Sequence, residues 1–411
     1  LMVVEKGKEQ IAEDIFKKWD LDFSVIGEVT ESGKLVITDK DELSAEIPIN
    51  LISEEAPLYN RPLAQPKYLD ETRNFDTSTI PIPNDFGEAL LTLLSSPTLA
   101  SKRWIYEQYD YMVRTNTLTL PGSDAAVVRI KDTTKAVAMT VNCNSKYCYL
   151  DPYIGAGIAV AESARNLACS GARPLAITDC LNFGSPENPE VMWQFDQAIN
   201  GMTEACLKLN TPVVSGNVSF YNETEGTAIY PTPTVGMVGL IENTDTHMTQ
   251  WFKNEGDLIV LLGETKEEIG GSEYLKQIHR EVSGRPPELD VDRELKLIEV
   301  LIKAAEKSKL NTAKNISEGG LGVALSESCF TPKDPLGVEI SVPHLIRKDA
   351  ILFSETQGRA IVSLNDKNLN KLKELTEELD LPMEVIGRVK GTRLLIKDLI
   401  DIPISKAYAK W

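Results

Sequence analysis

Short apolar runs and longer amphipathic stretches alternate along much of the chain. Runs rich in Val, Ile, Leu and Ala predict strands over residues 125–130, 136–141, 174–178, 212–215, 235–241 and 258–262. Longer stretches predict helices over residues 88–94, 101–110, 154–170, 189–209 and 292–307. Because strands and helices alternate, the pattern indicates an α/β (α+β) fold.

The beginning and the end of the chain repeat one pattern. Asp20-Leu21 and Val25-Ile26-Gly27-Glu28-Val29 return as Asp380-Leu381 and Val385-Ile386-Gly387-Arg388-Val389, a shift of 381 − 21 = 360 residues without gaps. Each copy predicts a strand, a helix and two further strands. A long domain precedes the second copy, whereas the first copy begins at Leu1. We therefore expect residues 1–55 to be the tail of an upstream repeat.

The remaining chain divides into three predicted parts. Five prolines lie among polar residues in the segment 56–95, which predicts a linker, and they are Pro57, Pro62, Pro66, Pro81 and Pro83. Residues 96–245 predict one α/β domain. Residues 246–411 predict a second domain, which ends in the second copy of the repeat.

Composition excludes several classes of protein. The 411 residues are 42% hydrophobic and 25% charged, which is typical of a globular protein with more than one domain. The net charge, 43 − 61 = −18, opposes non-specific binding to nucleic acid or anionic lipid. No apolar run approaches the roughly 20 residues of a membrane helix. We expect neither a nucleic acid nor a membrane among the partners.

The cysteines and histidines add little chemistry. Six cysteines are too few for a disulfide scaffold, and they lack the spacing of a zinc site. The first residues lack the parts of a signal peptide, so we expect reduced thiols and a cytoplasmic protein. His247, His279 and His344 lie in polar or loop-like segments with no constellation of Asp, Glu and Cys around them, and we expect them at the surface.

Two predicted strands end in polar residues suited to a nucleotide. Asp179 follows the run 174–178, and Gly216, Asn217 and Ser219 follow the run 212–215. In α/β sheets, ligands collect outside the carboxyl ends of strands. Gly216 would let backbone N–H groups approach a phosphate, Asp179 and Asn217 offer oxygen ligands for Mg²⁺, and Ser219 offers a donor for a substrate oxygen. Spacing alone fits a cap and a turn equally well.

Two turns are weaker candidates for chemistry. Asp124, in Pro121-Gly122-Ser123-Asp124, would either hold a cation or close the turn. The glycine-rich turn 317–322 would either bind a phosphate at the start of a helix or serve as a tight turn. The sequence contains no Walker A motif, which disfavours a P-loop NTPase.

The chain resembles the small-type synthetase subunit of phosphoribosylformylglycinamidine synthase, an enzyme family of purine biosynthesis. The resemblance is carried by Glu107–Thr117, Pro121–Val127, Ser170–Gly184, Ser215–Asn222 and Gly270–Leu275. It implies tandem repeats similar to aminoimidazole ribonucleotide synthetase, of which this chain holds the end of the first and the whole second. The first-type domains of the two repeats are expected to pair into a shared barrel.

The resemblance implies an ATP-dependent C–N ligase. Such an enzyme uses ATP and Mg²⁺ to join glutamine-derived ammonia to formylglycinamide ribonucleotide through an iminophosphate, giving formylglycinamidine ribonucleotide. By motif, it implies ATP contacts at Asp179 and Gly216, a Mg²⁺ ligand at Asn217 and a substrate contact at Ser219. It places the catalytic histidine in the first repeat, so no catalytic residue is expected in this chain. It also places a Glu-Ser-Gln substrate motif in the first repeat, and the second copy departs from that motif with Glu355-Thr356-Gln357, for which no substrate role is expected.

The resemblance also implies partners. These are the N-terminal half of the same polypeptide, a separate glutaminase subunit and a small bridging subunit, and the chain alone is expected to be inactive. Two alternatives stay open. One is a non-catalytic scaffold paralogue, which the intact Asp179 and the motif 215–219 disfavour. The other is a different enzyme of the aminoimidazole ribonucleotide synthetase superfamily, which the 360-residue repeat disfavours.

Overall fold

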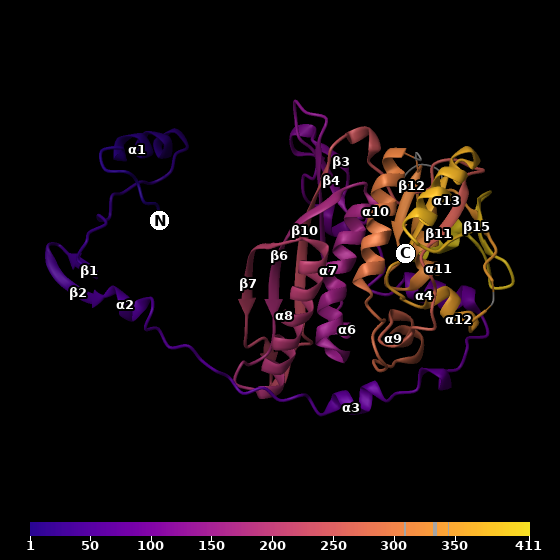
Figure 1. Ribbon diagram of the computed structural model, residues 1–411, viewed down its shortest axis with the longest axis horizontal. Helices are drawn as coiled ribbons and strands as arrows, with labels where there is room; N and C mark the ends of the chain where they lie inside the picture. Colours follow the sequence, from indigo (N-terminus) through magenta and orange to yellow (C-terminus); the bar gives the residue numbers. More distant parts are fainter. Residues whose placement is uncertain (308–309, 332–334, 344) are drawn as a thin grey trace. The chain divides into compact units, whose positions relative to one another are not determined.

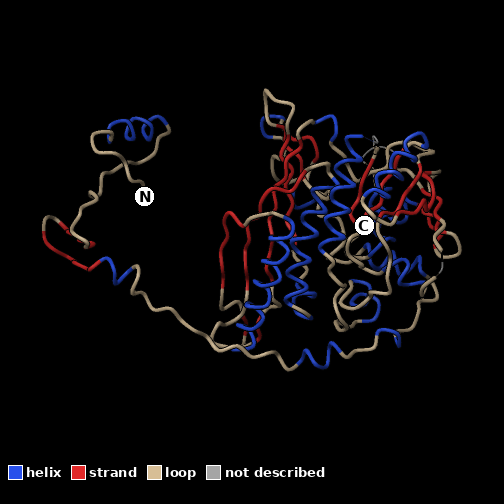
Figure 2. Tube along the Cα trace, viewed as in Figure 1, coloured by secondary structure: helices blue, strands red, loops and turns tan. Residues whose placement is uncertain are grey.

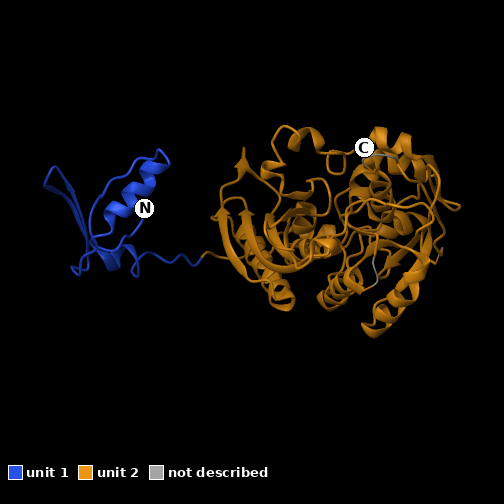
Figure 3. Ribbon diagram, turned by 90° about the horizontal axis from the view of Figure 1, so that it is seen from above, with its two compact units in different colours: residues 1–60 blue, residues 61–411 orange. Residues whose placement is uncertain are grey.

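The computed structural model describes residues 1–411 except 308–309, 332–334 and 344. Residues 1–60 and residues 61–411 form two compact units, which Figure 3 shows in different colours.

The first unit is a helix followed by a hairpin. Helix α1 (Glu9–Lys18) precedes an antiparallel pair of strands, β1 (Lys34–Asp39) and β2 (Glu42–Pro48), and a single turn of helix, α2 (Ile49–Ile52). Most apolar side chains of this unit are exposed, and Ala12 is its one buried hydrophobic residue among those described.

The repeat is confirmed for its helix but not for all its strands. A shift of 360 residues maps α1 onto α13 (Leu369–Glu378). The strands predicted near residues 1–4 and 25–29 are absent, because residues 1–5 and 21–30 are coil. Their counterparts in the second copy, β14 (Ala360–Leu364) and β15 (Met383–Val389), both pair with β11 (Leu258–Leu262) between them. No described strand of the first unit offers that pairing partner.

The second unit begins with an extended strap, residues 61–85, that contacts both of its lobes. Helix α3 (Tyr68–Arg73) lies in the strap, followed by the 3-10 turn η1 (Thr77–Thr79). Arg73 pairs with Asp151 of the first lobe at 2.8 Å. Arg347 of the second lobe donates to the carbonyl oxygens of Thr77 and Ile80 at 3.0 and 2.9 Å. The strap passes beneath both lobes in Figure 1.

The first lobe, residues 117–241, is built on a six-stranded sheet in the order β3-β4-β5-β10-β6-β7. Its strands are β3 (Thr117–Thr119), β4 (Ala126–Arg129), β5 (Ala136–Asn142), β6 (Arg173–Asn182), β7 (Val213–Ser219) and β10 (Thr232–Ile241). Only β6 and β7 pair in parallel. A short hairpin of β8 (Glu223–Thr224) and β9 (Thr227–Ala228) follows β7.

Three helices cover one face of this sheet, namely α6 (Ser145–Leu150), α7 (Pro152–Cys169) and α8 (Pro189–Leu209). Each begins with an Asn or Asp whose side chain accepts from a backbone N–H, which is the expected N-cap. The opposite face exposes Met139, Val141 and Val238, whose side chains are 41%, 74% and 40% exposed. This surface is called the open face.

The second lobe, residues 258–411 with the preceding helix α4 (Phe86–Leu94), has a seven-stranded sheet in the order β12-β14-β11-β15-β13-β16-β17. The remaining strands are β12 (Thr312–Asn315), β13 (Val338–Ile340), β16 (Arg393–Ile396) and β17 (Ile400–Pro403). Its helices are α9 (Glu273–His279), α10 (Val291–Lys307), α11 (Gly320–Cys329), α12 (Lys348–Phe353), α13 and α14 (Ile404–Lys410).

The two lobes share one core. Leu167 of α7, Leu297 of α10 and Val260 of β11 belong to the same cluster of buried side chains. The helices α7, α8 and α10 lie between the two sheets, as Figure 2 shows. A second cluster on the other side of the seven-stranded sheet contains α4, α11, α12 and α14.

The predicted helix over 101–110 is wrong in extent. Only Arg103–Tyr106, labelled α5, is helical, and the chain then passes through a short 3-10 turn with Arg114 and Thr115 at positive φ. Trp104 and Tyr109 are exposed here, so no packing holds a longer helix in place.

Candidate functional site

Asp179 and Gly216 lie side by side on the parallel strands β6 and β7. A Cβ atom placed on Gly216 would overlap Asp179 Oδ1 and lie 2.9 Å from Oδ2. The carboxylate therefore occupies the space that any other residue at position 216 would fill. The glycine is required at this position by the neighbouring carboxylate, whatever ligand the pair binds.

The Asp179 side chain lies on the helix-covered side of the sheet. Side chains alternate along a strand, and Ile177 and Leu181, two positions away on either side, are 0% and 3% exposed. Partial burial raises the pKa of the Asp179 carboxyl above its ordinary value.

Asn217 and Ser219 belong to the opposite face. Asn217 lies opposite Cys180 of β6, and Ser219 lies opposite Asn182. Cys180 and Asn182 point away from the face on which Ile177 and Leu181 are buried. The four predicted residues therefore lie within a few residues of one another on β6 and β7, but they divide between the two faces. Asp179 and Gly216 are on the covered face, and Asn217 and Ser219 are on the open face.

The boundaries predicted for these two strands are wrong. The run 174–178 was expected to stop before Asp179, and the run 212–215 before Gly216, but β6 continues to Asn182 and β7 to Ser219. The polar residues are part of the sheet because β6 is hydrogen-bonded on both sides, to β10 and β7, over this stretch. Asn217 and Ser219 are tolerated in the sheet because they lie on the open face, whereas Asp179 is partly buried on the covered face beside the edge strand β7.

Ser219 is held by a residue that sequence analysis did not single out. The Asn222 side chain donates from Nδ2 to the carbonyl oxygens of Ser219 and Phe183 at 2.8 and 3.0 Å. The same nitrogen lies 3.1 Å from Ser219 Oγ. The available signal was that Asn222 closes the motif 215–222, three residues after Ser219.

Asn217 and Ser219 present side-chain oxygens on the open face, whereas the carboxylate of Asp179 lies beside Gly216 on the covered face. Asn217 is exposed and offers an amide oxygen, which is a suitable Mg²⁺ ligand. The space above Gly216 is shaped around the Asp179 carboxylate. Among the described residues, no group of three or more His, Cys, Asp or Glu side chains is arranged to hold a metal ion. Asn217 by itself would thus supply one ligand of several.

Asp124 was a candidate ligand for a cation, and in the structure its carboxylate forms an ion pair with the side chain of Lys314. Lys314 Nζ lies 2.5 Å from Asp124 Oδ1 and 2.9 Å from a Glu327 carboxylate oxygen. The backbone N–H of Asn315 donates to Asp124 Oδ2 at 2.8 Å. Burial alone would lower the pKa of Lys314, but the two carboxylates outweigh burial and raise it.

The glycine-rich turn before α11 is also filled from within. Glu355 Oε1 accepts the backbone N–H of Gly319 at 2.8 Å and that of Glu273 at 2.8 Å, while Tyr147 donates to the other oxygen. A carboxylate at the start of a helix occupies the place where a phosphate would bind. The prediction of a phosphate site at residues 317–322 is therefore replaced by an internal carboxylate contact.

Two carboxyl groups of the lobe interface have strongly raised pKa values. Burial, with a smaller contribution from the charge of Glu318, raises the pKa of Glu162 to about 8. Burial raises the pKa of Glu355 to about 7, against the opposing effect of Lys146. Nearby, Arg165 is fully buried and pairs with Glu294.

The two histidines within the described part of the chain make local contacts. His247 Nδ1 lies 2.7 Å from the Thr244 carbonyl oxygen, and His279 Nε2 lies 3.1 Å from the Tyr274 hydroxyl. Burial lowers the pKa of His279. His344 lies outside the described residues.

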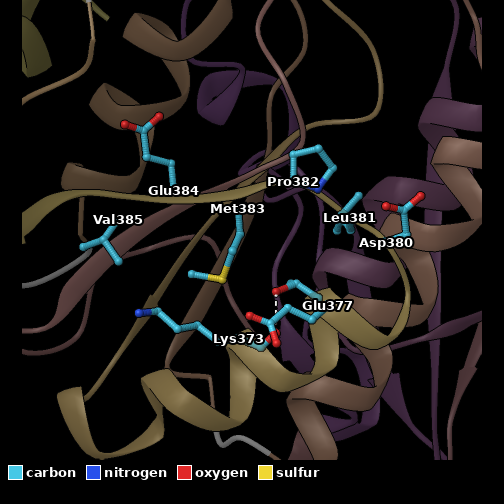
Figure 4. Close-up of a pocket in the computed structure, with 9 residues that line it drawn as sticks. Lys373, Glu377, Asp380, Leu381, Pro382, Met383, Glu384 and Val385 are labelled. Atoms are coloured by element: carbon cyan, nitrogen blue, oxygen red, sulfur yellow. Dashed lines mark hydrogen bonds between the residues drawn. The ribbon is translucent and has the colours of Figure 1, made fainter.

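An open hollow of about 750 Å³ lies between α13 and β15 of the second lobe (Figure 4). Met383 extends from β15 toward Lys373 of α13, and Glu377 and Glu384 also line the hollow. None of the four predicted site residues lines it. The hollow is therefore separate from the candidate site on β6 and β7.

Family models match both lobes. The model of the AIR synthase related protein, N-terminal domain, matches residues 122–241, and the model of its C-terminal domain matches residues 254–396. The two matches together cover more than half of the chain. This chain belongs to the AIR synthase related family. The match confirms the predicted fold class and assigns the first lobe to the N-terminal type and the second to the C-terminal type.

Curated relatives within this family are named phosphoribosylformylglycinamidine synthase subunit PurL. The protein of Moorella thermoacetica is 49% identical over 416 residues, and that of Caldanaerobacter subterraneus subsp. tengcongensis is 46% identical over 415. Each match covers 100% of this chain and 56% of the relative. The family resemblance inferred from the motifs is confirmed, and the chain spans about half the length of these relatives.

Solved structures of this fold include "T. maritima PurL complexed with FGAR", with a TM-score of 0.65 and 20% identity over 79% of this chain and 54% of that chain. "Structure of PurLQS from Thermotoga maritima" matches with a TM-score of 0.64 and 23% identity over 94% of this chain and 54% of that chain. A chain of the "Crystal structure of HypE-HypF complex" matches with a TM-score of 0.55 and 13% identity over 74% of this chain and 97% of that chain. At these identities the likeness shows the fold alone.

No described helix is both long and apolar enough to cross a membrane.

Proposed function

We propose that this chain is part of an ATP-dependent C–N ligase that makes formylglycinamidine ribonucleotide in purine biosynthesis. Its substrates are formylglycinamide ribonucleotide, ATP and ammonia derived from glutamine. The observation that carries the proposal is the placement of Asp179, Gly216, Asn217 and Ser219 on two adjacent strands, together with 46–49% identity to relatives named for this synthase.

The proposed chemistry has two steps. The amide oxygen of the ribonucleotide takes the γ-phosphoryl group of ATP and releases ADP, giving an iminophosphate. Ammonia then attacks the activated carbon, and phosphate leaves with the former amide oxygen. Asp179 and Gly216 contact ATP, Asn217 supplies one ligand to the Mg²⁺ that neutralises phosphoryl charge, and Ser219 binds the ribonucleotide.

This chain contributes one half of that site, and the other half comes from an upstream repeat. Two observations support this division. Among the described residues no carboxylate cluster completes a metal site around Asn217. The open face of the six-stranded sheet exposes the apolar side chains of Met139, Val141 and Val238. Exposed apolar side chains on one face of a sheet are typical of a surface that another domain covers. We propose that the equivalent domain of the upstream repeat packs on this face and closes a barrel.

Residues 1–60 are proposed to complete the last domain of that upstream repeat. Ile26 and Val29 are 80% and 83% exposed, whereas their counterparts Ile386 and Val389 are 1% and 0% exposed. The exposed side chains would be buried if a strand equivalent to β11 lay beside them.

The proposed partners are a separate glutaminase subunit, which supplies ammonia, and a small bridging subunit. We place the enzyme in the cytoplasm. The free state of all six cysteines supports a reducing compartment. A net charge of −18 disfavours nucleic acid as a partner.

The test is an assay of amidine formation from ammonium, ATP and formylglycinamide ribonucleotide. The chain is assayed alone and joined to the N-terminal half of the polypeptide. The joined protein is expected to be active and the chain alone inactive. Full activity of the chain alone would contradict the half-site proposal, and an inactive joined protein would contradict the proposed function.

The alternative of a non-catalytic scaffold predicts a different result. Asp179→Ala and Asn217→Ala in the joined protein would then leave its activity unchanged. If the proposed site is correct, each substitution lowers activity at limiting ATP.

A further inference from the structure

The loop that follows β7 is fixed at both of its ends. Phe220 packs against Phe195 of α8 with ring centroids 5.1 Å apart. The backbone N–H of Asn222 donates to the carbonyl oxygen of Phe183 at 3.1 Å, and that of Tyr221 donates to Gly184 at 3.0 Å. Ser219 thus begins a loop that is tied to the chain leaving β6.

The side chain of Asn222 has a fixed orientation. Its Nδ2 has two carbonyl acceptors, Ser219 O and Phe183 O, at 2.8 and 3.0 Å. Carbonyl oxygens accept only from the nitrogen end of an amide, so these two contacts decide which end of the side chain is which. The same orientation brings Oδ1 to 3.3 Å and Nδ2 to 3.1 Å from Ser219 Oγ.

The two Nδ2 hydrogens have the two carbonyl acceptors, so the Asn222 amide contacts the Ser219 hydroxyl chiefly as an acceptor, through Oδ1. The Ser219 hydroxyl can donate its hydrogen to Asn222 Oδ1 or, by rotating that hydrogen, to an oxygen of a bound molecule. In either case Oγ keeps its position beside Nδ2. A hydroxyl held in this way loses little conformational freedom when it binds.

We propose that Asn222 is a positioning residue for the ribonucleotide substrate, which it orients through the Ser219 hydroxyl without touching the substrate itself. The inference rests on the proposed function, because it takes Ser219 as the substrate contact. It adds that the hydroxyl works at full strength only while the Asn222 amide holds it.

A purely structural role of Asn222 makes a different prediction. If Asn222 only closes the loop, its loss lowers thermal stability and acts independently of Ser219. If it positions the hydroxyl, its loss has no further effect on substrate binding once the hydroxyl has been removed. A double-mutant cycle separates these outcomes, because it measures the coupling between the two side chains.

The experiment uses the protein joined to its N-terminal half, with ammonium as nitrogen donor and KM for formylglycinamide ribonucleotide as the main measurement. Ser219→Ala and Asn222→Ala are each expected to raise KM about five- to tenfold, with kcat changed less than about twofold. The double variant is expected to match Ser219→Ala. Asn222→Ser, which keeps a hydroxyl donor, is the milder second variant if Asn222→Ala folds poorly.

Asn243→Ala is the matched control. Asn243 also closes a turn, because its side chain accepts the backbone N–H of Asp245 at 3.0 Å. It lies just after the C-terminal end of β10, outside the loop that holds Ser219 and Asn222. Its loss is expected to leave KM unchanged. Melting temperatures of all variants show whether each one is folded.

Each outcome decides between the two proposals. Additive effects of Ser219→Ala and Asn222→Ala, or an unchanged KM in both Asn222 variants, would overturn the positioning role and leave the proposed function intact. An unchanged KM in Ser219→Ala would overturn the substrate contact and the positioning role together. Absence of amidine formation in the unsubstituted joined protein would overturn the proposed function.

Discussion

The carboxylate of Asp179 occupies the space where a side chain of Gly216 would begin, across a pair of parallel strands. The two positions are therefore coupled, because a side chain at position 216 would have to displace the Asp179 carboxylate. In the proposed site both contact ATP, so their coupling is open to a direct test.

Gly216→Ala is expected to displace the Asp179 carboxylate and to lower kcat/KM for ATP about ten- to a hundredfold in the joined protein. Asp179→Ala is expected to lower it as well, and the double variant no further. The measurement is initial rate against ATP concentration. A Gly216→Ala protein with normal ATP dependence would show that the carboxylate position does not matter for ATP.

Glu162→Gln is expected to stabilise the chain at alkaline pH. The pKa of Glu162 is raised to about 8 in the folded protein from an ordinary value of 4.5. The folded state thus binds the proton more tightly, and this stability is complete below about pH 4.5 and is lost as pH rises through 8. Glutamine carries no charge, so the variant avoids the loss.

The measurement for Glu162→Gln is urea unfolding between pH 5 and pH 9. A gain of about 1–3 kcal/mol over the unsubstituted chain is expected at pH 9, shrinking toward acid pH. Glu204→Gln is the control, because Glu204 is exposed on α8 and hydrogen bonding from Tyr153 lowers its pKa. The same gain at pH 5 and pH 9 would contradict the explanation.

Lys314→Met is expected to lower the free energy of unfolding by about 3–5 kcal/mol, because it leaves the buried carboxylate of Asp124 and the partly buried carboxylate of Glu327 without their cation. Adding Asp124→Asn should restore part of the loss, since the amide needs no counter-ion. Denaturant midpoints of the single and double variants measure both effects. If the double variant is no more stable than Lys314→Met, the ion pair is not the cause.

The two copies of the repeat are expected to differ in backbone hydrogen exchange. Residues 383–389 form the paired strand β15, whereas residues 21–30 are coil, so fast exchange is expected in the first copy and slow exchange in the second. Joining the N-terminal half should slow exchange at residues 21–30. Equal protection of the two segments in the chain alone would contradict the description of residues 1–60.

The pattern of apolar and polar residues predicted the bounds of helices and strands closely where one face of the element, or all of it, is buried. The strand 258–262 and the helix 189–209 have the predicted bounds, because an apolar run and an Asn-Pro start are local signals. The continuation of β6 through Asp179 was missed, since its hydrogen bonds come from β10 and β7. The sequence distance to those partners hides them from a local pattern.

The candidate site was predicted by motif, and its surroundings were not. Asp179 and Ser219 carry a recognisable pattern, but nothing local shows that they belong to opposite faces of the sheet. The partners of Asp124 and of the turn 317–322 were also hidden, because Lys314 and Glu355 are supplied by distant segments. Charged partners that are far apart in the sequence produce no local motif, so the sequence alone does not predict such pairs.

The position of α7 limits how this protein can move. Its small side chains pack against the six-stranded sheet on one side and against α10 on the other, within a single core. A hinge between the lobes would have to expose the buried side chains of that core, and this cost opposes such a movement. If the proposed barrel forms, a ligand on the open face would be enclosed by the packed upstream domain and not by a movement of one lobe against the other.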